Sequence, residues 1–101
     1  MKSQEQAYLD VSLRLPIGIP SVKQRLDRAM EQVLAPGYQV AMVRYNPSVY
    51  LISKESTSVA QEHGVTYTVT AQDCTCPDFQ SAYGSLCKHR LAVMILEEME
   101  R

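Results

Sequence analysis

Three cysteines and a histidine lie close together near the carboxyl end of this 101-residue chain. The cysteines are Cys74, Cys76 and Cys87, and the histidine is His89. An odd number of cysteines cannot complete a disulfide framework, so metal binding is the better interpretation. A shared metal constrains the fold strongly, because the two halves of the motif must converge on one point.

The amino terminus reads Met-Lys-Ser-Gln-Glu-Gln, which is too polar for the apolar core of a signal peptide. No apolar run approaches the roughly 18 residues that a membrane helix needs. We therefore expect a cytoplasmic protein, or a nuclear one if the host is a eukaryote, with no membrane partner. A cytosolic compartment would also keep the thiols reduced.

Three thiolates and one imidazole are a donor set that zinc takes tetrahedrally. A C-x-C pair in a tight turn can place both sulfurs on one ion, and a C-x-H pair can do so where a turn runs into a helix. The ten residues 77–86 suffice to fold back and close the site. Zinc with three thiolates carries a charge of about −1, which Lys88 and Arg90 beside the histidine could offset.

Four protein donors leave no coordination position for water or substrate, so we predict one structural Zn²⁺ and no catalytic one. The sequence also offers no Ser-His-Asp set, Gly-rich phosphate loop or paired carboxylates. We predict a non-enzyme without a small-molecule substrate. An iron–sulfur cluster held by three Cys and one His is the chemical rival, and its visible absorbance would distinguish it from colourless zinc.

The remaining sequence predicts helices and strands within a single domain, residues 1–101. Residues 7–15 roughly alternate between apolar and polar side chains, which predicts a strand. Ser21 can cap a helix that Pro36-Gly37 ends. The expected elements are, in order, a strand at 7–15, a helix at 21–35, strands at 38–45, 49–53 and 65–71 with a polar loop at 54–64, and a helix from about 86 to the end.

We therefore expect an α+β fold with a small antiparallel sheet of three or four strands. The helix at 21–35 and the carboxyl-terminal helix should cover the sheet, and the zinc site should lie at the strand–turn–helix near the carboxyl terminus. Residues 1–48 form an unassigned strand/helix/strand part, and residues 49–101 form the zinc-binding part.

The run Cys74-Thr-Cys-Pro-Asp-Phe79, followed by Cys87-Lys-His-Arg-Leu-Ala-Val93 and preceded by a strand, resembles the SWIM zinc finger. The resemblance covers roughly residues 49–97. It implies a short β-hairpin followed by a helix, with zinc held by Cys74, Cys76, Cys87 and His89. Members of the family occur in transposases, chromatin remodelling ATPases, ubiquitin ligases and recombination accessory proteins, so the resemblance implies DNA or protein binding.

Two functions remain open. One is a DNA-binding module that acts through Lys88, Arg90, Arg44 and Lys54. The other is an adaptor that docks on a larger recombination, transposition or remodelling protein. The family favours the first, whereas a net charge of −1 favours the second, because phosphate neutralisation supplies most nucleic-acid affinity.

Other side chains have simpler interpretations. His63 is expected to be a solvated loop residue. Three tyrosines could stack on unpaired bases, but aromatic residues are also good strand formers, which we favour; they are Tyr45, Tyr50 and Tyr67. The basic side of the helix at 21–35 is interleaved with acids and predicts a solvated face; its residues are Lys23, Arg25, Asp27, Arg28 and Glu31.

Overall fold

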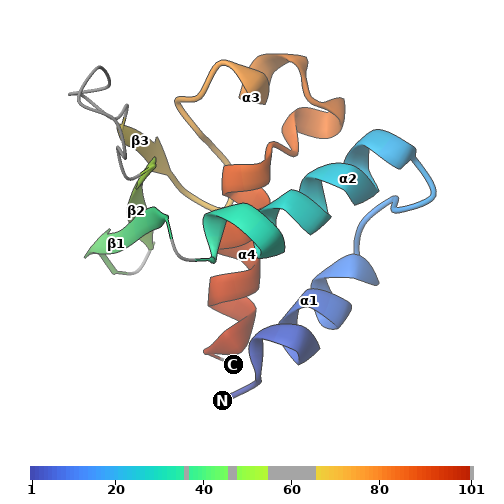
Figure 1. The fold of residues 1–101 in the computed structure, drawn as a ribbon, viewed down its shortest axis with the longest axis horizontal. Helices are drawn as coiled ribbons and strands as arrows, with labels where there is room; N and C mark the ends of the chain where they lie inside the picture. Colours follow the sequence, from blue (N-terminus) through green and yellow to red (C-terminus); the bar gives the residue numbers. More distant parts are fainter. Residues whose placement is uncertain (36, 46–47, 55–65, 101) are drawn as a thin grey trace.

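The computed structural model describes residues 1–35, 37–45, 48–54 and 66–100. Within these residues a three-stranded antiparallel sheet lies beside a group of helices (Figure 1). The sheet order is β1-β2-β3, so each strand pairs with the next one along the chain. The predicted α+β class is confirmed, with three strands in the described part.

The strands are β1 (Tyr38–Arg44), β2 (Val49–Lys54) and β3 (Thr66–Val69). The strands predicted at 38–45 and 49–53 are therefore confirmed. The strand predicted at 65–71 is present over Thr66–Val69, and residue 65 lies outside the described residues. Val40 of β1 lies opposite Ile52, which lies opposite Tyr67 of β3. The turn expected at Asn46-Pro47 and most of the polar loop at 54–64 lie outside the described residues.

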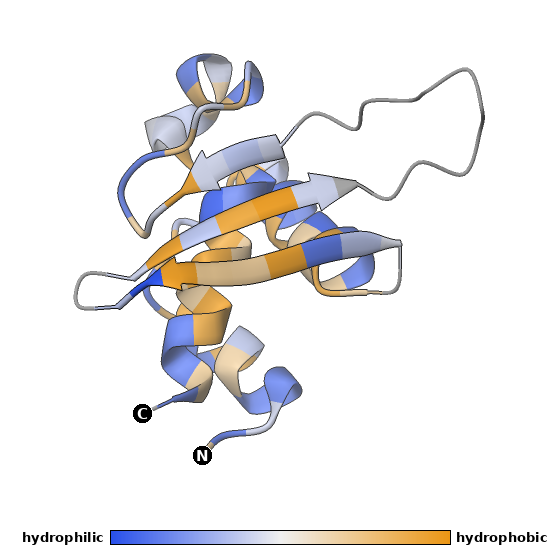
Figure 2. Cartoon of the chain, turned by 90° about the vertical axis from the view of Figure 1, so that its left-hand side faces the viewer, coloured by the Kyte–Doolittle hydropathy of each residue, from blue (hydrophilic) through white to orange (hydrophobic). Residues whose placement is uncertain are grey.

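The two faces of the sheet differ in burial. Tyr50, Ile52 and Val69 are buried toward the helices, whereas Thr66 and Thr68 are exposed on the other face. Figure 2 looks onto the exposed face, with the helices behind the sheet. Among the described residues, the core therefore lies on one side of the sheet.

Helix α4 (Lys88–Met99) is the centre of that core and confirms the predicted carboxyl-terminal helix. Its apolar side chains point to neighbours on several sides, since α1, α2, η1 and β3 all pack against it. This is why its sequence is apolar almost all round. The completely buried members are Leu91, Ala92, Val93 and Ile95.

The predicted helix at 21–35 is present as α2 (Pro20–Arg28), which continues as the π-helical turn η1 (Ala29–Val33). It begins one residue before the expected cap Ser21. Proline suits the first helical position because its missing N–H has no partner there. The π turn is closed by the Leu34 N–H, which donates to the Ala29 carbonyl at 3.0 Å.

The predicted strand at 7–15 is wrong, because the chain forms helix α1 (Gln4–Ser12) there. The Ser3 hydroxyl caps this helix by accepting a hydrogen bond from the Gln6 N–H at 3.1 Å. Ala7 and Val11, one turn apart, are completely buried on the side that packs against α4. Two leucines that suggested a strand face are exposed instead, Leu9 at 53% and Leu13 at 83%.

Candidate metal centre

Cys74 is placed by a tight turn that follows β3. The Thr70 N–H donates to the Asp73 carbonyl at 2.8 Å, and the Thr70 hydroxyl accepts from the Asp73 N–H at 2.9 Å. The chain then reverses, so that Cys74 bridges Val69 in antiparallel fashion. This is the β-hairpin that the resemblance implied.

Cys76 lies two residues further on, and its backbone N–H points at the sulfur of Cys74 at 3.4 Å. Between them, Thr75 faces outward and extends the pairing with β3. Its N–H donates to the Thr68 carbonyl at 3.2 Å, and its hydroxyl accepts from the Thr68 N–H at 3.0 Å. The outward Thr75 therefore leaves both flanking sulfurs on the inner side of the turn.

Cys87 and His89 lie at the start of α4. Cys87 is the N-cap residue with extended backbone angles, and His89 is the second residue of the helix. The sequence predicted this arrangement. The His89 ring also packs against Tyr67 of β3, with 5.0 Å between ring centroids, which ties the helix start to the sheet.

Two short helices lead the chain from Cys76 to Cys87, namely α3 (Asp78–Ser81) and η2 (Tyr83–Ser85). Helix α3 begins directly after Pro77, its N-cap residue. The reversal uses left-handed backbone at Gly84 and Ser85, with φ of 58° and 57°. Phe79 is half-buried and packs against the core.

The four predicted ligands converge on one point. One donor atom from each residue lies within 4.8 Å of the others, and all four residues are buried. The Cys74 sulfur lies 3.8 Å from Nδ1 of His89. Donors around a tetrahedral zinc ion at ordinary bond lengths are about 3.6–3.8 Å apart, so the cluster has the size that zinc requires.

The electrostatics of the cluster favour a bound cation. The pKa of the Cys87 thiol is lowered to about 4, first by a hydrogen bond with Cys74 and further by His89, although burial opposes this shift. The pKa of Cys74 is raised by its hydrogen bond with Cys87 and by burial, and burial raises that of Cys76. The cluster therefore accommodates one thiolate, and the other two need a compensating positive charge.

Arg25, which the sequence predicts to lie on a solvated face, instead belongs to this site. Its Nε and Nη2 donate to the two carboxylate oxygens of Asp78 at 2.8 and 2.9 Å. Asp78 follows Cys76 by two residues, so α2 is bonded directly to the loop between the ligands. The two residues are 53 positions apart, and only the Cys-Pro-Asp context of Asp78 marked this region in the sequence.

The four cations predicted to contact a partner occupy different surroundings. Lys88 Nζ donates to the Tyr38 hydroxyl at 3.3 Å and to the Gln32 side chain at 3.4 Å. Arg90 donates to the carbonyls of Ala71, before Cys74, and of Ser85, before Cys87, both at 2.9 Å. It therefore ties the turn before Cys74 to the ligand loop (residues 77–86, between Cys76 and Cys87). Arg44 is exposed at one end of β1, and the backbone of Lys54 pairs with that of Tyr38 at the other end.

The three tyrosines do not form a common platform. Tyr50 is buried in the core, Tyr67 packs on His89, and Tyr45 is exposed. Their preferred interpretation as strand formers is consistent with this placement of Tyr50 and Tyr67. His63 lies outside the described residues.

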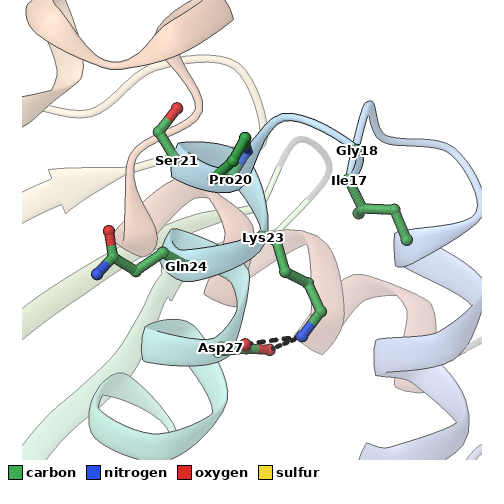
Figure 3. Close-up of a pocket in the computed structure, with 7 residues that line it drawn as sticks. All are labelled: Ile17, Gly18, Pro20, Ser21, Lys23, Gln24 and Asp27. Carbon is green, nitrogen blue, oxygen red and sulfur yellow. Dashed lines mark hydrogen bonds and ion pairs between the residues drawn. The ribbon is translucent and has the colours of Figure 1, made fainter.

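An open depression of about 560 Å³ lies elsewhere, at the start of α2 (Figure 3). Lys23 projects along it, but its ammonium is bonded to both carboxylate oxygens of Asp27 at 2.7 Å. The Tyr8 hydroxyl donates to the same carboxylate at 2.6 Å. These charges are satisfied by one another, and none of the four metal ligands lines the depression.

Comparison with known families agrees with this site. Residues 65–97 match the SWIM zinc finger family. No curated protein and no solved structure matches the chain significantly. The family match and the compact cluster together support one structural zinc. In the described ranges, none of the helices has the length and apolar character to cross a membrane.

Proposed function

Taking residues 65–97 as a SWIM zinc finger, we propose that the chain is a non-catalytic binding module whose fold is organised around one zinc ion. Cys74, Cys76, Cys87 and His89 hold the ion. The observation that carries this proposal is the convergence of three buried sulfurs and one imidazole nitrogen within 4.8 Å. Zinc supplies the positive charge that the buried thiolates need, and it links β3 to α4.

Metal content and a thiol count, before and after chelation, test the zinc site. We expect one zinc per chain with all three thiols shielded from modification. Chelation or Cys76→Ser should unfold at least residues 65–101, because the site does not exist in the unfolded chain. A chain without metal and with three reactive thiols, or a Cys76→Ser variant with full melting temperature and secondary structure, would contradict the proposal.

The surface around the start of α4 binds the phosphate backbone of DNA, and Lys88 is its central contact. Among the described residues, no carboxylate lies within 4.0 Å of the Lys88 ammonium or of the exposed guanidinium of Arg28. Both cations interact electrostatically with Asp78, which puts them on the same side of the molecule. The backbone of Lys54 pairs with Tyr38, whose hydroxyl accepts a hydrogen bond from Lys88. Lys54 therefore belongs to the end of the sheet that Lys88 contacts.

The other two predicted contacts, Arg90 and Arg44, have different roles in this proposal. Arg90 donates to backbone carbonyls and therefore acts in the fold. Arg44 pairs with Val49 at the opposite end of β1 from Tyr38. Lys88 is therefore the main phosphate contact, and Arg28, which the sequence predicts to lie on a solvated face, is an additional one. Lys54 stays a predicted contact.

Binding of duplex DNA at a series of salt concentrations tests this assignment. Two to three phosphate contacts predict a slope of about −2 to −3 for log K against log salt. Lys88→Gln and Arg28→Gln should each reduce the slope by about one. Lys23→Gln is the control, because it removes the same charge from an ammonium already bonded to Asp27. No binding by the zinc-loaded chain at about 50 mM salt would contradict DNA binding.

A second candidate function, an adaptor for a larger recombination, transposition or remodelling protein, is favoured by one observation. Apolar side chains are exposed at the end of β1, namely Met42 at 40%, Val43 at 55% and Tyr45 at 72%. Exposed apolar surface of this kind suits protein contacts. If DNA does not bind, Val43→Glu should abolish partner binding, whereas Leu13→Glu, at the exposed C-cap residue of α1, should not.

A further inference from the structure

We infer that Arg25 is a positioning residue for the zinc site, which it stabilises by holding Asp78 and thereby the ligand loop that begins at Cys76. Arg25 belongs to α2, outside residues 65–97. The inference rests on the zinc site proposed above and adds to it a residue from the amino-terminal part of the chain.

The contact between Arg25 and Asp78 has the geometry of a strong ion pair. Two guanidinium nitrogens meet two carboxylate oxygens at 2.8 and 2.9 Å, which is the bidentate arrangement that fixes both distance and orientation. Nη1 of Arg25 also donates to the Ser21 carbonyl of its own helix at 3.4 Å. The Arg25 side chain is only 19% exposed, so it is held on both sides.

The first turn of the loop, helix α3, has little local support of its own. Helix α3 is a single turn of four residues, none of which is buried, and its N-cap Pro77 provides no side-chain cap. A helix of this length is not stable by itself, because the cost of its nucleation is not recovered. The Phe79 N–H donates to the Cys76 carbonyl at 3.3 Å, a bond within the loop itself. The ion pair to α2 therefore anchors the loop from outside.

The electrostatics of Arg25 support the same positioning role. Its pKa is raised first by the hydrogen bonds to Asp78 and in smaller part by the negative charge of Cys87. Arg28 and Lys88 also act on Asp78 electrostatically, but neither lies within 4.0 Å of its carboxylate.

Zinc affinity of the full-length chain, measured by competition with a chelator of known affinity, tests the inference. Arg25→Gln should raise the dissociation constant for zinc by about tenfold, the lower end of the range for residues that support metal ligands. Lys23→Gln is the matched control on the same helix. It breaks an ion pair of α2 with Asp27 and leaves the ligand loop untouched, so its dissociation constant should stay within about twofold of wild type.

Two further variants separate positioning from charge. Arg25→Lys keeps the charge but offers a single ammonium instead of a planar fork, so it should restore only part of the affinity. If Arg25 acts through Asp78, Arg25→Gln combined with Asp78→Asn should bind zinc no more weakly than Arg25→Gln alone. Full restoration by lysine, or losses that multiply in the double variant, would overturn the inference.

Control measurements separate this inference from the failure of folding or of the zinc site itself. Far-UV circular dichroism at zinc saturation should be the same for wild type and Arg25→Gln, because α2 and α4 retain their buried contacts. An Arg25→Gln affinity within twofold of wild type would overturn the inference while leaving the zinc site intact. A wild-type chain that binds no zinc would instead overturn the proposed function, and the inference with it.

Discussion

The Lys2 ammonium lies 2.9 Å from a carboxylate oxygen of Glu98, so the two ends of the chain are joined. The Lys2 backbone N–H also donates to the Met99 carbonyl at 3.0 Å. Asp10 of α1 meets the same ammonium at 2.6 Å. The Glu98 side chain is only 8% exposed, and a buried carboxylate is tolerated where cations compensate its charge. The ion pair therefore fixes α1 against α4.

Removal of the Lys2 ammonium should destabilise the protein more than removal of an ordinary surface cation. Lys2→Met leaves the buried Glu98 carboxylate with weaker compensation, so we expect the melting temperature to fall by several degrees. Lys23→Met is the comparison, because its partner Asp27 is far more exposed than Glu98. Equal melting temperatures for the two variants would show that Glu98 does not depend on Lys2.

The helical register of α1 predicts opposite results for two neighbouring apolar side chains. Val11 is completely buried, whereas Leu13 is 83% exposed. Val11→Ala should lower the free energy of unfolding by roughly 1–3 kcal/mol through lost apolar contacts and a residual cavity. Leu13→Ala should change it by less than about 0.5 kcal/mol. Denaturant unfolding measures both, and equal losses would indicate that residues 11 and 13 share one face, as in a strand.

This pair also explains why the sequence alone misassigned the first element. Leucines at 9, 13 and 15 with Val11 alternate with polar residues, which satisfies the pattern of a strand. Ala7 and Val11 satisfy a helical repeat equally well, and alanine contributes little to an apolar pattern. Burial against α4 decides between the two patterns, and that contact joins opposite ends of the chain. Local sequence could not reveal it.

The metal ligands could be predicted because their chemistry is local. Cys74 with Cys76, and Cys87 with His89, each lie two residues apart, and so few side chains bind zinc that the pattern is specific. The surroundings of the site could not be predicted in the same way. Arg25 reaches Asp78 across 53 positions, and no sequence signal connects two ordinary charged residues at that distance.

Arg90 shows how a cation beside a ligand can act in the fold instead of on a partner. Its guanidinium donates to the carbonyl of Ala71, in the turn before Cys74, and to the carbonyl of Ser85, in the ligand loop. Arg90→Gln should lower the free energy of unfolding of the zinc-loaded chain by roughly 1–3 kcal/mol, because the carbonyls lose charged donors. Lys88→Gln should leave stability nearly unchanged. Chemical denaturation in excess zinc measures both, and a fully stable Arg90→Gln variant would contradict the structural role.

The buried thiols predict how zinc affinity depends on pH. Cys74 and Cys76 have pKa values above that of an ordinary thiol, as a result of burial and of the hydrogen bond between Cys74 and Cys87. Each must lose its proton before it can bind zinc. The zinc-bound chain therefore holds fewer protons than the zinc-free chain, so affinity rises with pH below the thiol pKa values and falls as the solution is acidified.

The slope of that dependence counts the protons released. Two thiols predict that affinity falls at least about a hundredfold for each pH unit between pH 8 and 6.5, since each proton contributes tenfold. Because removal of zinc should unfold residues 65–101, the pKa of Cys87, which is lowered to about 4 in the folded cluster, returns there to an ordinary value, and Cys87 adds a third proton. Competition titrations with a chelator at several pH values measure the slope. A value of one or less would mean that the thiols of Cys74 and Cys76 are not both ligands.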